Sequence, residues 1–314
     1  MEVLIGKLLR NGLWVNKEVS KIQIQHKKPS WLKIKLEKKD NFSDVKDILK
    51  ENNLVTVCEE AHCPNISECW NSGTATFMIM GNSCTRACKF CAVKTAFPGK
   101  PLDKEEPKKI ANVLKKWNLD YVVITSVDRD DLKDQGSNHF SDCIREVRKE
   151  NPSILIEVLI PDFKGQKELI KNVIDVKPNV IGHNIETVER LQKFVRDPRA
   201  NYNQSLGILK YVKEVDDEIY TKSSIMLGLG ETEEEVTKAM KDLREINVDF
   251  LTLGQYLRPS LKHIEVKEYV SPDKFNFYKK IGEELGFLYV ASGPFVRSSY
   301  KAGEFFIKSL IQNG

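Results

Sequence analysis

Three cysteines, Cys84, Cys88 and Cys91, follow a C-x3-C-x2-C spacing within "CTRACKFC". Thiolates this close in sequence can converge on one soft metal centre. A structural zinc site usually takes four ligands, whereas three thiolates can hold a [4Fe–4S] cluster and leave one iron open to a substrate or cofactor. The spacing therefore favours an iron–sulfur cluster, and a zinc site or buried thiols without a metal are the alternatives.

A second triplet, Cys58, Cys63 and Cys69, lies just upstream in "CEEAHCPNISECW" with C-x4-C-x5-C spacing. The same reasoning applies, because three thiolates again leave one ligand position vacant. The seventh cysteine, Cys143, falls in a stretch with the pattern of an amphipathic helix, and we expect an ordinary core or surface thiol there.

The composition is that of a globular protein. Of the 314 residues, 41% are hydrophobic and 30% are charged, which suits one large α/β domain or two ordinary ones. No apolar run reaches the roughly 18 residues of a membrane helix. The first residues lack a secretory pattern, and Glu2 and Glu18 disfavour a transit peptide. We expect a cytoplasmic protein, where clustered thiols indicate a metal or catalysis rather than disulfides.

The net charge of +4 is small but unevenly distributed. Residues 1–50 carry 12 Lys and Arg against 6 Asp and Glu. This segment is either a solvated basic arm or a surface that attracts an acidic partner. We find no nucleic-acid-binding motif of the usual kinds, and we predict no nucleic-acid partner and no membrane partner. We expect the protein to be a monomer.

Short apolar runs alternate with charged, helix-like stretches from about residue 74 onward. Near-continuous apolar strands that alternate with helices indicate parallel strands buried on both faces. The expected strands are 75–80, 120–126, 154–160, 179–185, 219–227 and 249–257, and the expected helices between them are 108–117, 141–150, 167–176, 205–215 and 233–246. This repeat predicts an α/β fold of the partial (β/α)6 TIM-barrel type, with its site at the carboxyl ends of the strands. A doubly wound sheet is the alternative. A short helix with Ser43 as N-cap is expected before the barrel.

"CTRACKFC" resembles the signature of the radical S-adenosylmethionine (SAM) superfamily. The resemblance implies a partial barrel whose open cluster iron binds SAM, and a 5′-deoxyadenosyl radical that abstracts hydrogen from an unactivated carbon. It places Phe90 beside adenine. "SSIMLGLGE" resembles the fifth-strand motif of the superfamily at Ser224, Met226, Gly228 and Glu231. "VDRDDL" offers Asp128 and Asp131 to the methionine amino group, although both could simply cap a helix.

The block from "CEEAHCPNISECW" to "CTRACKFC" resembles the lipoyl synthase family, and so does "GPFVRSSY" near the end of the chain. The resemblance implies that Cys58, Cys63 and Cys69 hold an auxiliary [4Fe–4S] cluster that gives up its sulfur. Ser299 would be the fourth ligand, and an oxygen ligand is displaced from a soft cluster more readily than a thiolate. Departures from the family pattern occur at "KTAFPGKP", at Gln135 and at Lys301.

The resemblance also implies an activity and partners. The enzyme would insert two sulfur atoms at C6 and C8 of a protein-bound octanoyl group. The carriers would be the lipoyl domains of 2-oxoacid dehydrogenase E2 subunits and the glycine cleavage H protein, and the electron donor a ferredoxin or flavodoxin. Three regions are expected: a cluster-bearing arm at 1–73, the radical SAM barrel at 74–285, and a C-terminal segment at 286–314.

Further cofactor contacts are expected at the strand ends, where packing roles are equally open. Asn184 is a candidate for the ribose, and Lys222 and Arg196 for the methionine carboxylate. Gln255, Tyr256 and Leu257 could line adenine or the acyl chain, and His183 is expected to be a scaffold residue. The competing functions are a different sulfur-inserting radical enzyme, a two-cluster electron carrier and a zinc-stabilised binding module.

Overall fold

The computed structural model describes residues 28–32, 41–61, 63–71, 76–117, 119, 121–299 and 309. Its centre is a seven-stranded sheet with strand order β1-β4-β5-β6-β7-β8-β9, and every neighbouring pair is parallel. The strands are β1 (Thr76–Ile79), β4 (Tyr121–Ser126), β5 (Leu155–Leu159), β6 (Val180–Gly182), β7 (Tyr220–Leu227), β8 (Phe250–Gln255) and β9 (Tyr289–Gly293). The order of the strands follows the chain, so each crossover returns beside the strand before it, as in an open barrel.

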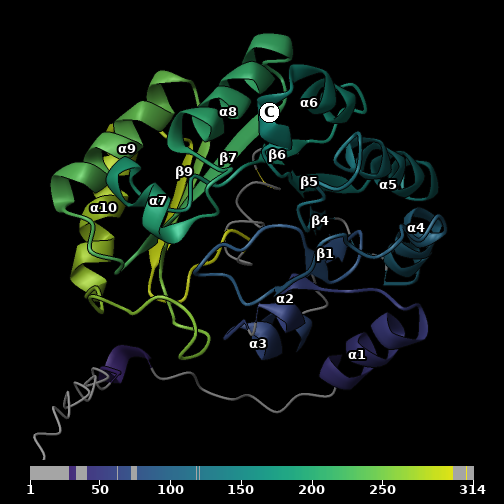
Figure 1. The fold of residues 1–314 in the computed structure, drawn as a ribbon, viewed down its shortest axis with the longest axis horizontal. Coiled ribbons are helices and arrows are strands. Elements are labelled where there is room, and N and C mark those ends of the chain that lie inside the picture. Colours follow the sequence, from purple (N-terminus) through teal and green to yellow (C-terminus); the bar gives the residue numbers. More distant parts are fainter. Residues whose placement is uncertain are drawn as a thin grey trace, which may run out of the picture.

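Helices follow most of the strands and form an outer layer around the curved sheet (Figure 1). The longer ones are α4 (Glu106–Trp117), α5 (Ser137–Glu150), α6 (Lys167–Ile174), α8 (Tyr202–Val215), α9 (Glu233–Glu245) and α10 (Pro272–Glu284). Shorter elements are α7 (Gln192–Val195), the 3-10 turns η1 (Ser30–Leu32), η2 (Phe163–Gly165) and η3 (Glu189–Leu191), and the ribbon of β2 (Ser83–Cys84) with β3 (Lys94–Thr95). Among the described helices, none has the length and hydropathy of a membrane-spanning segment.

Local sequence explains where these helices begin. Thr232 and Glu235 form a reciprocal capping box at the start of α9. Ser271 caps α10, and Pro272 takes the first helical position, where its missing N–H costs nothing. The expected cap at Ser43 is wrong, because α1 (Asn41–Glu51) has already begun two residues earlier.

The expected partial barrel is confirmed, and the sheet has one strand more than the six expected. β9 pairs with β8 from Phe250↔Tyr289 to Gly254↔Gly293. This strand lies within the segment 286–314 that we expected to follow the barrel, so that segment begins inside the sheet. The strand escaped prediction because its apolar run is short and ends in "ASG".

Two short helices, α2 (Val57–Glu60) and α3 (Ile66–Asn71), precede the barrel and lie near β1 (Figure 1). The amide of Met78 in β1 donates to the Val55 carbonyl, and Thr56 forms a β-bridge with Phe77. Thr56 also caps α2 through its side chain. These contacts place the first cysteine triplet beside the first strand of the barrel.

Candidate functional site

One cavity of about 550 Å³ opens at the carboxyl ends of the strands. Its walls come from the loops after β1, β4, β5, β6 and β8, from the segment around α2 and α3, and from residues 295–299. All six clustered cysteines and Ser299 line it: Cys58, Cys63, Cys69, Cys84, Cys88 and Cys91. The volume falls within the range of about 300–1,000 Å³ that is typical of ligand pockets. The two triplets that the sequence separates therefore face one space.

The second triplet occupies the loop between β1 and α4. The amide of Arg86 donates to the Cys84 sulfur at 3.4 Å, and the amide of Asp197 donates to the Cys88 sulfur at 3.3 Å. Burial raises the pKa of Cys84, Cys88 and Cys91 to about 12, and each thiol further raises the pKa of another member of the triplet. Three mutually repelling groups with N–H···S donors suit a bound cationic metal centre, which would stabilise their thiolate forms.

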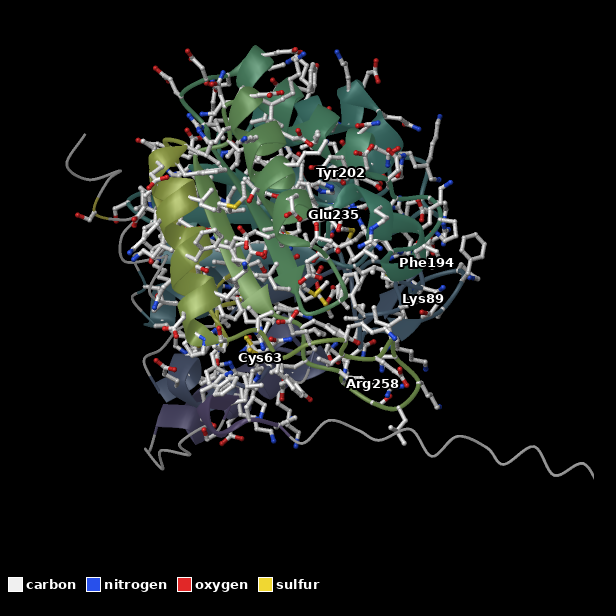
Figure 2. The ribbon with its side chains drawn as sticks, turned by 90° about the vertical axis from the view of Figure 1, so that its left-hand side faces the viewer. Cys63, Lys89, Phe194, Tyr202, Glu235 and Arg258 are labelled. Atoms are coloured by element: carbon white, nitrogen blue, oxygen red, sulfur yellow. The ribbon has the colours of Figure 1, made fainter. Side chains whose placement is uncertain are left out.

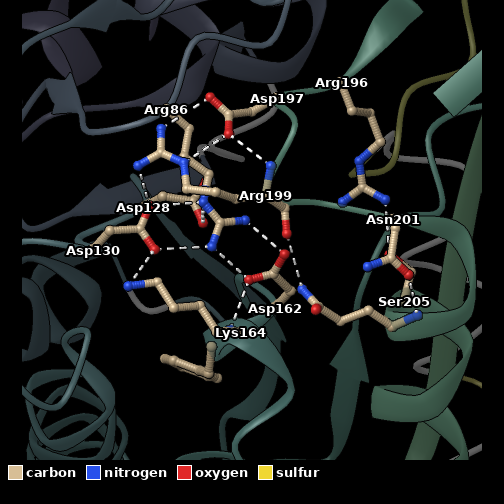
Figure 3. A network of polar contacts seen from close by, with 12 residues as sticks. Arg86, Asp128, Asp130, Asp162, Lys164, Arg196, Asp197, Arg199, Asn201 and Ser205 are labelled. Carbon is tan, nitrogen blue, oxygen red and sulfur yellow. Dashed lines mark hydrogen bonds and ion pairs between the residues drawn. The ribbon is translucent and has the colours of Figure 1, made fainter. Parts of the chain in front are cut away.

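Arg86, between the first two cysteines of this loop, anchors it to the barrel (Figure 3). Its guanidinium forms two hydrogen bonds with Asp162, at 2.6 and 2.7 Å, and two with Asp130, at 2.8 and 3.0 Å. Although burial opposes ionisation, these bonds lower the pKa of Asp162. A planar guanidinium can satisfy two carboxylates in this way, whereas an ammonium cannot. The sequence reading did not single out Arg86, although it sits inside the cysteine motif.

Asp197 and Arg199 extend this network to the other side of the loop (Figure 3). The Asp197 carboxylate accepts a hydrogen bond from the Ala87 amide at 2.9 Å. Arg199 pairs with Asp197 at 2.7 Å and also donates to the Thr85 carbonyl at 2.9 Å. The backbone on either side of Arg86 is therefore fixed by side chains from beyond β6.

The first triplet is joined to the segment that follows β9. The Asn65 amide group donates to the Phe295 carbonyl at 2.7 Å, across 230 residues. Burial raises the pKa of the Cys63 thiol, and the nearby Arg297 guanidinium opposes that rise. Arg297 is half-buried, and partial loss of solvent around its guanidinium lowers its pKa, so a partly desolvated cation lies beside Cys63. Ser299 lines the cavity two residues further on, and Tyr300 lies outside the described residues.

A polar wall at the end of β6 contains Asn184, Glu186 and Arg196, which all line the cavity. Asn184 donates to Glu186 at 3.2 Å. Burial raises the pKa of Glu186, and Arg196 opposes this rise. We did not single out Glu186 from the sequence. The available signal was a carboxylate two residues beyond Asn184, at the mouth of a parallel strand.

Two buried polar atoms on the cavity wall have no hydrogen-bond partner among the described residues. They are Nε of Arg196 and Oγ of Ser126. Arg196 uses another nitrogen, which donates to Ser205 at 2.7 Å. An unpartnered buried guanidinium N–H is costly, and an anionic ligand would satisfy it. The wall therefore fits a molecule that carries a carboxylate and hydroxyl groups, as SAM does.

The predicted cofactor contacts Phe90, Asp128, Asn184, Arg196 and Tyr256 line the cavity. Asp128 lies 3.7 Å from the Cys84 sulfur, and burial raises the pKa of Asp128 to about 6 against the opposing effect of Arg86. The Tyr256 hydroxyl donates to the Ile264 carbonyl at 2.9 Å, so its ring is the part left for a ligand. Gln255, Leu257, Ser224, Met226 and His183 also line the cavity.

Lys222 and Gly228 do not line the cavity, and we withdraw them as cofactor contacts. The Lys222 ammonium is buried in the barrel interior, 2.8 Å from a Glu157 carboxylate oxygen. Tyr121 donates to the same carboxylate. A buried ammonium that is already paired has no free charge for a cofactor.

The Gly228 and Leu229 amides bind Glu231, which closes a turn. Asp131 pairs with Arg129 at 2.8 Å instead of facing the cavity.

Comparisons with known proteins agree with this geometry. The model of the radical SAM superfamily matches residues 78–243, and that of the N-terminal domain of lipoyl synthase matches residues 9–63. The mitochondrial lipoyl synthase of Culex quinquefasciatus is 57% identical over 290 residues, which cover 91% of this chain and 76% of that protein. The chain belongs to the lipoyl synthase family. The Myxococcus xanthus lipoyl synthase is 54% identical over 286 residues, or 91% of this chain and 96% of that one.

Solved structures support the barrel. The [FeFe]-hydrogenase maturase HydG of Carboxydothermus hydrogenoformans superposes with a TM-score of 0.53 at 15% identity, over 85% of this chain and 78% of that one. Methylornithine synthase superposes with a TM-score of 0.52 at 13% identity, over 71% of this chain and 72% of that one. Likeness at this identity concerns the fold alone.

Membership of the radical SAM superfamily implies SAM and one [4Fe–4S] cluster as cofactors. Members of the lipoyl synthase family act on protein-bound octanoyl groups. The relatives include mitochondrial and bacterial proteins. The cytoplasmic location expected from the sequence therefore stays a prediction.

Proposed function

We propose that this enzyme converts a protein-bound octanoyl chain into a lipoyl chain by inserting sulfur at C6 and C8. The observation that carries the proposal is that both cysteine triplets and Ser299 line a single cavity. A two-cluster electron carrier has no need of such a cavity, and a zinc-stabilised module has no need of six cysteines around it.

We assign the second triplet, Cys84, Cys88 and Cys91, to the radical-generating cluster. When bound there, the cluster and SAM supply a 5′-deoxyadenosyl radical that removes hydrogen from an unactivated carbon. The three thiols give up their protons on loading, since their pKa values lie near 12 without a metal. Arg86 and Asp197 hold the loop so that the ligands are preorganised.

We assign SAM to the wall between the second triplet and β6. Arg196 would pair its unpartnered Nε–H with the methionine carboxylate. Asn184 and Glu186 would hydrogen-bond the ribose, and the Phe90 and Tyr256 rings would pack near adenine. Asp128 would accept a hydrogen bond from the methionine amino group.

We assign the first triplet, with Ser299, to an auxiliary [4Fe–4S] cluster that supplies the sulfur. Arg297 would balance the negative charge of this cluster from beside Cys63. The apolar part of the wall would receive the octanoyl chain and exclude water; it includes Leu32, Val57, Met78, Leu159, Ile225 and Met226. The carriers would be octanoylated E2 domains or the H protein, with a ferredoxin or flavodoxin as the electron donor.

A direct test incubates the anaerobically reconstituted enzyme with an octanoylated lysine peptide, SAM and dithionite. The expected product carries two additional sulfur atoms and, after oxidation of the dithiol, two fewer hydrogens. 5′-Deoxyadenosine release without any sulfur in the peptide would contradict the proposal.

A further inference from the structure

An exposed patch covers the outer side of the cluster-binding loop. We define the outer patch as Lys89, Lys193, Phe194, Leu261 and Lys262. Phe194 is 65% exposed and Leu261 is 75% exposed, and the three lysines are also exposed. Figure 2 shows Lys89 and Phe194 beside each other at the edge of the molecule. Large apolar side chains this open to water, set among charges, are typical of a contact surface.

Backbone hydrogen bonds join the three segments of the outer patch. The Lys89 amide donates to the Val195 carbonyl at 2.9 Å, and the Ile264 amide donates to the Lys89 carbonyl at 3.2 Å. His263 Nε2 lies 3.0 Å from the Cys91 carbonyl oxygen. The patch is therefore built directly onto the loop that carries Cys88 and Cys91.

The outer patch is positively charged. Its three segments, 87–90, 192–195 and 260–264, contain no Asp or Glu. Lys89, Lys193 and Lys262 have no ion pair within the described part of the chain. The nearest flanking acids are already neutralised: Glu189 by Lys238 at 3.4 Å, Asp197 by Arg199, and Glu265 by Lys267 at 3.7 Å. The surface thus fits an acidic partner.

The patch lies outside the cavity, on the loop whose neighbouring residues line it. Cys88, Phe90 and Cys91 line the cavity, whereas Lys89 and the other patch residues do not. A molecule on the patch would lie against the backbone that carries two of the proposed ligands and leave the cavity free. A carrier that delivers an acyl chain must instead approach the cavity opening.

We propose that the outer patch docks a small acidic electron carrier that reduces the cluster held by Cys84, Cys88 and Cys91. In each encounter one electron leaves the reduced carrier and enters the cluster, so the carrier is oxidised by one electron. The inference rests on the proposed function, which requires this reduction. Redox encounters of this kind bury little surface, often below about 1,200 Å² in total, and depend on charge. A small patch with three lysines and two apolar side chains meets both conditions.

The test uses the double variant Lys193→Glu with Lys262→Glu and, separately, Phe194→Ser. Each holoenzyme is assayed with an octanoylated peptide and SAM, once with reduced flavodoxin and once with dithionite. We expect the charge reversal to slow the flavodoxin-driven reaction at least about tenfold, because steering attraction becomes repulsion. The Kd for oxidised flavodoxin should rise in parallel, and the dithionite-driven rate should stay at the wild-type value.

The matched control is Lys104→Glu with Lys116→Glu, a charge reversal of the same size on exposed lysines at α4. It should leave both reactions unchanged. An equal loss with dithionite, or unchanged flavodoxin-driven turnover, would overturn the inference. So would a rise in KM for an octanoylated carrier protein under dithionite, which would assign the patch to the acyl carrier. The dithionite arm on wild-type enzyme tests the proposed function independently.

Discussion

The buried imidazole of His183 is held in its neutral form. Burial lowers the pKa of His183 to about 4 from an ordinary value of 6.5, and the Arg196 cation acts in the same direction. One ring nitrogen lies 2.9 Å from the Ile160 carbonyl oxygen and the other 3.0 Å from the Ser205 hydroxyl. The residue is thus a hydrogen-bonded scaffold between β5, β6 and α8, as its position in the sequence suggested.

This pKa predicts a specific loss of stability in acid. At neutral pH the His183 side chain is uncharged in both the folded and the unfolded state, so its contribution to the free energy of unfolding is fully present. As the pH falls below 6.5, His183 becomes protonated in the unfolded state, whereas in the folded state it stays neutral until about pH 4. The contribution lost over that window is about 3 kcal/mol. Urea unfolding of wild type and His183→Gln from neutral pH downward should therefore converge, and parallel curves would contradict the assignment.

Substitutions in the two cysteine triplets should impair two different steps, SAM cleavage and sulfur insertion. Changing Cys84, Cys88 or Cys91 to Ala should reduce 5′-deoxyadenosine release to the level without enzyme, because SAM loses its cluster. Changing Cys58, Cys63 or Cys69 to Ala should retain measurable cleavage and give no thiolated product. Chromatography of the nucleoside and mass spectrometry of the peptide measure the two outcomes. Equal loss of cleavage in both sets would contradict the division of labour.

Sequence reasoning predicted the cysteine ligands from thiol spacing, which is a local signal, and the structure brings these six cysteines to one cavity. It misassigned Lys222, because a lysine near a strand end carries no mark of the Glu157 partner 65 residues away. It overlooked Glu186, whose role depends on the facing Arg196 and not on its neighbours in sequence. Local patterns predicted the metal chemistry, and long-range pairing decided the other contacts.

At the scale of an element, β8 approaches the C-terminal segment through Gly254. A Cβ on Gly254 would lie 2.2 Å from the Val296 carbonyl oxygen, and this contact is with backbone that cannot rotate away. Gly254→Ala should therefore displace the segment that carries Arg297 and Ser299. A displacement of this kind can cost about 100-fold in rate. We expect that loss in sulfur insertion and a much smaller loss in 5′-deoxyadenosine release.

The matched control is Gly207→Ala on the exposed face of α8, where a Cβ would meet nothing within 4 Å. It should raise the free energy of unfolding by about 0.5–1 kcal/mol, since alanine favours a helix over glycine. Its sulfur insertion should equal that of the wild type. Equal product yields from both alanine variants would show that the β8 contact does not position the segment.

The loop that carries Cys84, Cys88 and Cys91 is a second element, and Arg86 is one of the residues that hold its geometry. Arg86→Lys keeps a positive charge but loses the forked bonds to Asp130 and Asp162. We expect it to lose iron from the second triplet and to keep the iron of the first. Arg145→Lys, on an exposed pair with Asp142, is the control and should bind iron normally. Iron and sulfide analysis of both proteins provides the measurement, and full loading of Arg86→Lys would contradict this role.

The alternation of strands and helices was predictable along the chain, because parallel strands buried on both faces have continuous apolar runs. All six expected strands are present, and no end differs by more than three residues. β9 was missed, as were α2, α3 and α10. The boundaries at 73 and 285 remain a proposal, since β9 joins the barrel to the segment beyond.

At the scale of the whole molecule, the site depends on a contact between the segment before β1 and the segment after β9. Asn65 donates a hydrogen bond to Phe295, and Arg297 lies near Cys63. These contacts join two segments that are separated by the whole barrel in sequence, and they close the cavity on this side. No local pattern could predict that contact. In the proposed function, this contact would bring a substrate at the first triplet within reach of a radical formed at the second.

In the proposed function, the metal centre of the first triplet is consumed as the sulfur source. The most direct measurement reconstitutes the enzyme with heavy-isotope sulfide, removes the excess, and follows a single turnover on an octanoylated peptide by mass spectrometry. We predict that both inserted sulfur atoms carry the heavy isotope and that the first triplet loses iron in step. Product sulfur of natural isotopic composition, with the iron content unchanged, would contradict the claim.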